Sequence, residues 1–85
     1  MPEISRFLGI VIAMFYRDHE PAHFHATYGD FAITVDIRTG EVHGEFPKRA
    51  QRLVLEWCEE HRNELLEDWD LARSGQPLRR IEPLE

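Results

Sequence analysis

Histidine and aspartate residues before position 44 could bind a metal ion or transfer protons. His19, His23 and His25 lie close together, and Asp36 and His43 follow soon after them. Two imidazoles and one carboxylate form a common ligand set for a divalent transition metal and leave coordination positions open. Two histidines that flank a carboxylate could instead serve as acid and base near neutral pH, with the carboxylate orienting one ring.

Turn positions in the sequence indicate which of these residues lie opposite one another. Segments 23–28, 31–38 and 41–46 are predicted to be strands, and Gly29 and Gly40 lie in the two short turns between them. If both turns are two-residue loops, the antiparallel register places His23 opposite Asp36 and Asp36 opposite His43. The same registers gather apolar residues on the other face, and a slip by one residue would destroy that separation.

We therefore predict one polar site on this face of the sheet. The candidate catalytic residues are His23, Asp36 and His43, and the candidate metal ligands are His19, His23, His25 and Asp36. The alternative is a solvated sheet face on which Asp36 forms an ordinary hydrogen bond to a histidine, since polar sheet faces are common. The sequence leaves metal binding, acid–base chemistry and the solvated face open.

The elements that carry this site are those of a small α+β domain. The 85 residues, with 42% hydrophobic and 31% charged side chains, allow one domain with one core, at 1–85. We expect a four-stranded antiparallel β-meander with strands at about 5–16, 23–28, 31–38 and 41–46. One long C-terminal α-helix at about 47–73 packs on one face, because apolar residues recur there with helical spacing.

The ends of the predicted helix are marked by Pro47 and Gly75. A continuous helix of this length would be about 40 Å long, so it either projects beyond the sheet or breaks near Asn63. On its apolar side we expect Cys58 to be a buried, reduced thiol and His61 to be a core or boundary residue. The tail at 76–85 could lie along the body or dock on a partner.

Charge is distributed unevenly along the chain. There are 16 acidic and 10 basic side chains, a net charge of −6, and the excess acid lies at 56–70. A basic footprint over the domain is absent, which disfavours high-affinity nucleic-acid binding by this chain alone. Lys48, Arg49 and Arg52 crowd the expected helix start, where they could bind phosphate, an RNA backbone or an acidic partner, or could simply be solvated.

The distribution of apolar residues predicts a partner and excludes a membrane span. The longest apolar run, at 7–16, is too short to cross a bilayer and has no basic leader before it, so we expect a cytoplasmic protein. One helix can cover only one face of the sheet, whereas the first strand is apolar on both faces. Leu55 and Leu66 also lie off the main apolar stripe of the helix. We therefore predict a homo-oligomer, such as a dimer, or a complex with a small protein.

Several segments of the chain resemble a known family. They are ISRFLGI at 4–10, DHEPAHFH at 18–25 with Tyr28 and Gly29 after it, PKRA at 47–50, LVLEW at 53–57 and GQPL at 75–78. Together they cover nearly the whole chain and resemble the small bacterial family named domain of unknown function 4160. The family usually has a second proline where this chain has Ala22. No activity is assigned to the family.

The resemblance implies a role in a two-gene module, because members of this family look like one half of compact toxin–antitoxin-like pairs. We therefore expect a component of such a two-protein module that acts through a protein partner. The histidines and Asp36 support a second hypothesis, a metal-dependent or histidine-based ribonuclease or other hydrolase. A transcriptional regulator is the third, although the chain has no helix-turn-helix pattern and its predicted helix is mostly acidic.

Overall fold

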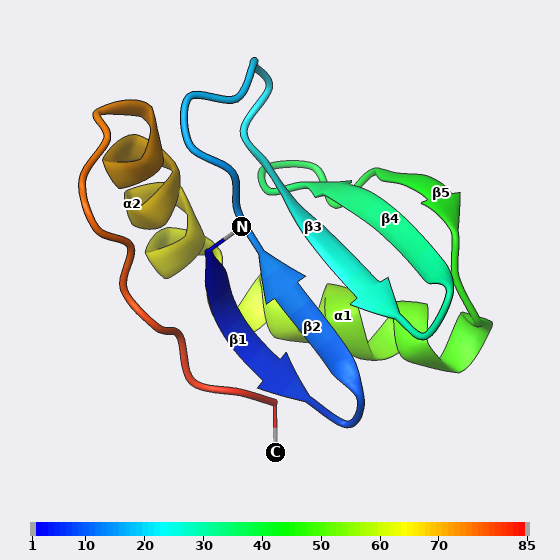
Figure 1. Cartoon of the computed structure of the whole chain (residues 1–85). Helices are drawn as coiled ribbons and strands as arrows, with labels where there is room; N and C mark the ends of the chain where they lie inside the picture. Colours follow the sequence, from blue (N-terminus) through cyan, green and yellow to red (C-terminus); the bar gives the residue numbers. More distant parts are fainter. Residues whose placement is uncertain (1, 85) are drawn as a thin grey trace.

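Five antiparallel strands form a single sheet in the computed structural model, which describes residues 2–84. The strands are β1 (Glu3–Phe7), β2 (Ile10–Ala13), β3 (His23–Tyr28), β4 (Phe31–Asp36) and β5 (Val42–Glu45), and they lie in chain order across the sheet (Figure 1). Two helices follow, α1 (Lys48–Glu60) and α2 (Arg62–Arg73). The predicted α+β class and antiparallel meander are confirmed, whereas the prediction of four strands and one long helix is wrong.

The first predicted strand, at 5–16, is a hairpin. β1 and β2 are joined by Leu8 and Gly9, whose φ angles are 51° and 81°, and Phe7 pairs with Ile10 across the turn. Two central residues with positive φ are typical of a type I′ turn, in which asparagine and glycine are common and leucine is rare. The apolar run therefore resembled one continuous strand, because only Gly9 signalled the reversal.

The register predicted between β3 and β4 is confirmed. His23 lies opposite Asp36, and Ala26 lies opposite Ile33. Alternate residues of β3 point to opposite faces of the sheet. Ala26 and Phe24 are fully buried on the face that α1 covers, so the histidines of β3 lie on the other face.

The register predicted between β4 and β5 is wrong by two residues. Thr34, and not Asp36, lies opposite His43. The Oδ1 atom of Asp36 accepts hydrogen bonds from the backbone N–H groups of Arg38 (2.9 Å) and Thr39 (3.0 Å), and these bonds stabilise a turn longer than the predicted two-residue loop. A shift of two keeps every side chain on its face, but it separates His43 from Asp36. The predicted cross-strand row of catalytic residues is therefore not formed.

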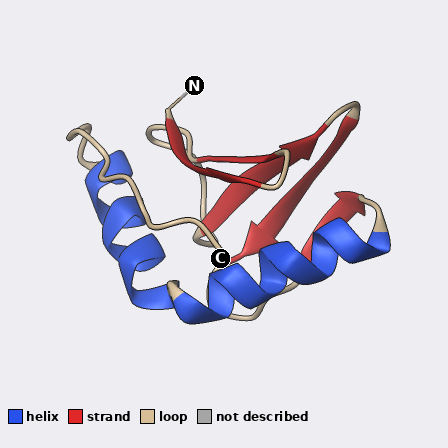
Figure 2. Cartoon of the chain, turned by 90° about the horizontal axis from the view of Figure 1, so that it is seen from below, coloured by secondary structure: helices blue, strands red, loops and turns tan. Residues whose placement is uncertain are grey.

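The predicted helix at 47–73 is divided at His61, close to the break anticipated near Asn63. The φ and ψ angles of His61 are −118° and 24°, which lie outside the helical region. Its backbone N–H donates to the carbonyl oxygens of Trp57 (3.0 Å) and Cys58 (3.3 Å). α1 lies across one face of the sheet, and α2 leaves its end at a steep angle (Figure 2). Within residues 2–84, neither helix has the length and apolar character needed to cross a membrane.

Trp57 of α1 lies at the centre of the core. It is fully buried, and its ring centroid is 5.6 Å from those of Phe7 in β1 and Phe24 in β3. Cys58 is a buried free thiol, as predicted, and burial raises its pKa. His61 packs its ring 5.6 Å from that of Trp57 and is half-buried, which is the boundary position predicted for it.

The segment after α2 lies along β1 rather than away from the body (Figure 1). The backbone N–H of Ile81 donates to the carbonyl oxygen of Ile4 at 2.8 Å, and Ile81 is buried. The indole N–H of Trp57 donates to the carbonyl oxygen of Glu82 at 2.8 Å. Of the two alternatives for the tail, residues 76–84 adopt the one in which the tail completes the core.

Candidate functional site

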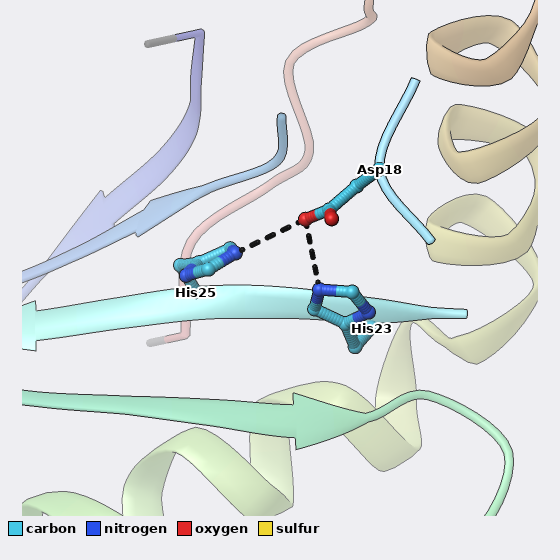
Figure 3. A group of neighbouring side chains, drawn as sticks. All are labelled: Asp18, His23 and His25. Atoms are coloured by element: carbon cyan, nitrogen blue, oxygen red, sulfur yellow. Dashed lines mark hydrogen bonds and ion pairs between the residues drawn. The ribbon is translucent and has the colours of Figure 1, made fainter. Parts of the chain in front are cut away.

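Three side chains converge near the start of β3 (Figure 3). Asp18 comes from the loop between β2 and β3, whereas His23 and His25 belong to β3 itself. The Oδ2 atom of Asp18 lies 3.0 Å from Nε2 of His23 and 3.5 Å from Nε2 of His25. Each residue offers one ligand atom, and these three atoms all lie within 4.8 Å of one another. We refer to Asp18, His23 and His25 as the ligand cluster.

The loop that carries Asp18 is fastened to the end of α2. The backbone N–H of Arg17 donates to the carbonyl oxygen of Ala72 at 3.2 Å. Two residues after Asp18, the carboxylate of Glu20 forms an ion pair with Arg73 of α2. The position of Asp18 therefore depends on contacts between segments that lie more than fifty residues apart in the sequence.

His23 has an oxygen atom beside each of its ring nitrogens. Its Nδ1 lies 2.7 Å from the carbonyl oxygen of Pro21, and its Nε2 lies 3.0 Å from the carboxylate of Asp18. A carbonyl and an ionised carboxylate only accept hydrogen bonds, and a neutral imidazole has only one N–H to donate. With Nδ1–H on Pro21, Nε2 must therefore carry either a second proton or a metal ion.

His25 directs a buried nitrogen into the same cluster. Its Nε2 forms no hydrogen bond with the described residues, and its nearest charged neighbour is the Asp18 carboxylate at 3.5 Å. Burial lowers the pKa of His25, and the repulsive charges of His23 and His19 add to that effect, although Asp18 opposes it. The ring is held by Phe15, whose centroid lies 4.2 Å away in an edge-on arrangement. A neutral imidazole with an unpaired nitrogen is in the form that binds a metal.

Asp18 supplies the negative charge of the cluster. Partial burial acts to raise its pKa, but the backbone N–H of His19, which donates to Oδ1 at 2.8 Å, and the nearby His23 and His25 outweigh burial and lower the pKa. The carboxylate therefore stays ionised at neutral pH. One ionised carboxylate and two imidazole nitrogens form a set of ligand atoms that favours a divalent cation.

The distances within the cluster suit a tetrahedral metal site. Ligand atoms bound at 2.0–2.1 Å in a tetrahedron lie about 3.3–3.4 Å apart. The 3.0 Å and 3.5 Å separations from Asp18 to the two histidines bracket that value. The contact from Nδ1 of His23 to Pro21 is the kind of backbone hydrogen bond that fixes the tautomer of a metal-binding histidine. These two separations are compatible with a single bound ion, and the ligand atoms of His23 and His25 lie within 4.8 Å of each other.

The ligand cluster opens into a pocket of about 420 Å³ on the exposed face of the sheet. The other residues around the pocket are His19, Pro21, Thr34, Asp36 and His43. Three protein ligands leave at least one coordination position for water or a substrate. The pocket gives that position access to solvent.

The structure brings together some of the residues predicted from the sequence and separates others. His23 and His25 belong to the ligand cluster, while His19, Asp36 and His43 line the same pocket outside it. His19 is directed outward, with 84% of its side chain exposed.

The remaining pocket residues have local partners of their own. Nε2 of His43 lies 3.1 Å from Oε1 of Glu41. Asp36 caps the β4–β5 turn through its Oδ1 atom. The solvated-face interpretation therefore describes Asp36 and His43 better than it describes His23 and His25.

Asp18 is the member of the ligand cluster that the sequence prediction omitted. The signal for it was the spacing in DHEPAHFH at 18–25, where an aspartate precedes two histidines by five and seven residues. The loop at 18–22 has to fold back for Asp18 to reach β3. That reversal depends on the contacts with α2, which the local sequence does not indicate.

The predicted anion-binding residues lie away from this pocket. Lys48, Arg49 and Arg52 are exposed on the first turns of α1, which has no acidic residue in its first turn. Arg49 lines a second pocket together with Tyr28. Tyr28 ends β3, whereas the ligand cluster lies at its start, so the two candidate sites occupy opposite ends of that strand.

Comparison with known proteins identifies one family. The family model described as "Domain of unknown function (DUF4160)" matches residues 9–70. This span is most of the chain and contains the whole ligand cluster. No curated protein and no solved structure matches the chain.

Proposed function

This chain belongs to the DUF4160 family, and we propose that it binds one divalent transition-metal ion, such as Zn²⁺, through Asp18, His23 and His25. The observation that carries the proposal is the environment of His23. Both nitrogens of this ring face oxygen atoms that accept hydrogen bonds, and a metal ion between Nε2 of His23 and the Asp18 carboxylate would satisfy both contacts with a neutral ring. Nε2 of His25, which forms no hydrogen bond with the described residues, would provide the third ligand.

The proposed metal site supports hydrolytic chemistry. A metal ion with three protein ligands lowers the pKa of a bound water toward neutrality and so supplies a nucleophile. The chain itself orients His23 through the carbonyl of Pro21, and it leaves Thr34 and His43 along the pocket wall beside a bound substrate. We therefore propose a metal-dependent hydrolase, with the phosphodiester bonds of RNA as the first substrate to test.

Calorimetric titration of the full chain with zinc chloride tests metal binding. We expect one ion per chain, with a loss of affinity of at least about 100-fold in Asp18→Asn and His25→Ala, because removing even the partners of metal ligands costs 10–100-fold. His43→Ala is the matched control, since it removes a pocket histidine outside the cluster. Absence of binding to the wild type, or equal binding by all four proteins, would show that the proposal is wrong.

Hydrolysis is tested separately from binding. RNA is incubated with the zinc-loaded or manganese-loaded chain, with and without a chelator, and beside the His25→Ala variant. Cleavage that needs both the metal and His25 supports the hydrolase. If the chain binds one metal ion but does not cleave RNA with that ion, the metal site is retained and the RNA hydrolase proposal is wrong.

A second proposal is that the chain acts through a protein partner, as one component of a toxin–antitoxin-like two-protein module. The observation that favours it is a group of exposed large apolar side chains: Leu8, Tyr16, Tyr28 and Phe31. Leu8, Tyr28 and Phe31 lie at the tips of two neighbouring hairpins. Such groups on small domains commonly mark interaction sites. Co-expression with the product of the neighbouring gene, followed by size-exclusion chromatography, tests for a stable complex.

A further inference from the structure

We propose that the end of the molecule opposite the metal pocket binds an acidic peptide segment that carries an apolar anchor residue and belongs to a partner protein. The surface, which we call the tip cleft, has a volume of about 410 Å³ and is lined by Leu8, Ile10, Tyr28, Pro47, Arg49 and Leu53. This inference rests on the second proposal, that the chain acts through a partner, and is independent of metal binding.

Leu8 is the first observation that points to a ligand. Its side chain is 66% exposed, and its φ of 51° lies in the left-handed region. That backbone conformation costs an L-residue with a Cβ atom about 1–2 kcal/mol, and an exposed side chain recovers little of this by burial. Asparagine would suit the same turn position better. Leu8 therefore stabilises the isolated chain less than asparagine would at the same position. A contact between Leu8 and a partner would explain why leucine is present there.

The aromatic residues at the neighbouring hairpin extend the apolar surface. Tyr28 and Phe31 form the last pair of β3 and β4, and they are 38% and 45% exposed. The ring of Tyr28 lies 6.1 Å from that of Phe46, which is only half-buried. The apolar face of the sheet thus extends past the start of α1, where no element of the described chain covers it. A partner side chain such as leucine or phenylalanine fits a cleft of this kind.

The basic residues beside the cleft favour a negatively charged partner. Lys48, Arg49 and Arg52 are exposed and form no ion pair with any described residue. Arg17, Arg38, Arg62 and Arg79 form none either, but only these three lie together on the first turns of one helix. Cations near a helix N-terminus are unfavourable by about 0.3–1 kcal/mol each, because the helix dipole is positive there. The start of α1 therefore combines three unpaired cations with unsatisfied backbone N–H groups. Carboxylates of a bound peptide would neutralise both.

A peptide fits this surface better than a nucleic acid does. The chain has ten basic and sixteen acidic side chains. Without Lys48, Arg49 and Arg52, seven basic side chains remain against the sixteen acidic ones. The rest of the chain is therefore strongly acidic, which disfavours an extended phosphate backbone that runs beyond the cleft. A short segment with one apolar anchor and two or three carboxylates needs only the cleft and its basic rim.

The test uses a fluorescein-labelled peptide of alternating glutamate and leucine, with fluorescence polarisation as the readout. We expect binding that weakens as salt is raised and that falls at least about tenfold in Arg49→Glu and in Leu8→Asp, a loss of about 1.4 kcal/mol. The matched control is Arg38→Glu, because it makes the same charge change on the exposed β4–β5 turn. The thermal unfolding midpoint of each variant shows whether it is folded, independently of metal binding.

Several outcomes would show that the tip cleft does not bind an acidic peptide. These are equal binding of a lysine–leucine peptide, unchanged affinity in Arg49→Glu, or displacement of the peptide by an RNA oligomer at lower concentration. Self-association that Leu8→Asp abolishes would instead assign the surface to a second copy of this chain. If a co-expressed partner binds the wild type and both cleft variants equally, the chain still acts through a partner but not through this surface.

Discussion

The indole ring of Trp69 packs against the imidazole ring of His23, with their centroids 5.2 Å apart. Trp69 belongs to α2, and it can reach β3 only because the helix is broken at His61. Its indole N–H is buried without a hydrogen-bond partner in the described chain, so its contribution here is packing. The break between α1 and α2 therefore places a rigid aromatic wall behind a proposed metal ligand.

This contact provides an optical test of the site. Cu²⁺ or Ni²⁺ bound to His23 should quench the fluorescence of Trp69, because a paramagnetic ion would lie within several ångströms of the indole. Trp57 is buried in the core and should retain most of its emission. A Trp69→Phe variant should bind the ion and lose most of the quenching, whereas Trp57→Phe should keep it. The reverse pattern would place the ion elsewhere.

Metal binding should be nearly independent of pH around neutrality and should weaken in acid. Burial lowers the pKa of His25, which keeps its ring neutral and able to bind a metal at neutral pH. Protons compete with the metal for this ring only when the pH falls through that lowered pKa. Zinc titrations at a series of pH values measure the effect. Zinc affinity that stays constant into strong acid would contradict a role for His25 as a ligand.

Replacing Leu8 should separate stability from binding. Leu8→Asn places a favoured residue at a position with a φ of 51°, so the free energy of unfolding should rise by about 0.5–1 kcal/mol. Peptide affinity at the tip cleft should fall in the same variant. Chemical denaturation and fluorescence polarisation measure the two effects. A variant that is less stable than the wild type would show that Leu8 contributes to folding in a way that its exposure hides.

Asp68 should give the fold a pH dependence of its own. Its carboxylate is buried, Oδ1 accepts the backbone N–H of Arg79 at 3.0 Å, and burial raises its pKa. A group whose pKa is higher in the folded state stabilises the fold at low pH, and that stabilisation is lost as pH rises through its pKa. Relative to Asp68→Asn, the wild type should therefore gain stability as pH falls from 7 toward 4, by about 1.4 kcal/mol for each unit of pKa shift.

The control for this effect is Asp70→Asn, two residues away on the same helix but exposed. Its stability relative to the wild type should hardly change over the same pH range. Thermal unfolding at several pH values measures both variants. An Asp68→Asn curve parallel to that of the wild type would mean that the carboxylate is solvated in the folded chain.

The sequence predicted the parts of the fold that local patterns determine. The β3–β4 register followed from Gly29 and from alternating apolar residues, and it correctly placed His23 opposite Asp36. The β4–β5 register failed because Gly40 suggested a two-residue loop, whereas the side chain of Asp36 stabilises a longer one. The β1–β2 turn was missed because Leu8 is an uncommon residue at positive φ.

The ligand cluster could be predicted only in part, for a similar reason. His23 and His25 alternate along one strand, so local periodicity was enough to place them on one face. Asp18 reaches them through a loop that is held by Ala72 and Arg73. These contacts join residues that are more than fifty positions apart in the sequence. They form only when α2 packs beside the loop, so no local sequence pattern predicts them.

X-ray absorption spectroscopy of the zinc-loaded chain identifies the atoms bound to the metal ion. We expect a four-coordinate ion with nitrogen and oxygen ligands at about 2.0–2.1 Å and the multiple-scattering pattern of two imidazoles, reduced to one in His25→Ala. A shell without imidazole scattering, or one containing a sulfur ligand at about 2.3 Å from Cys58, would contradict it.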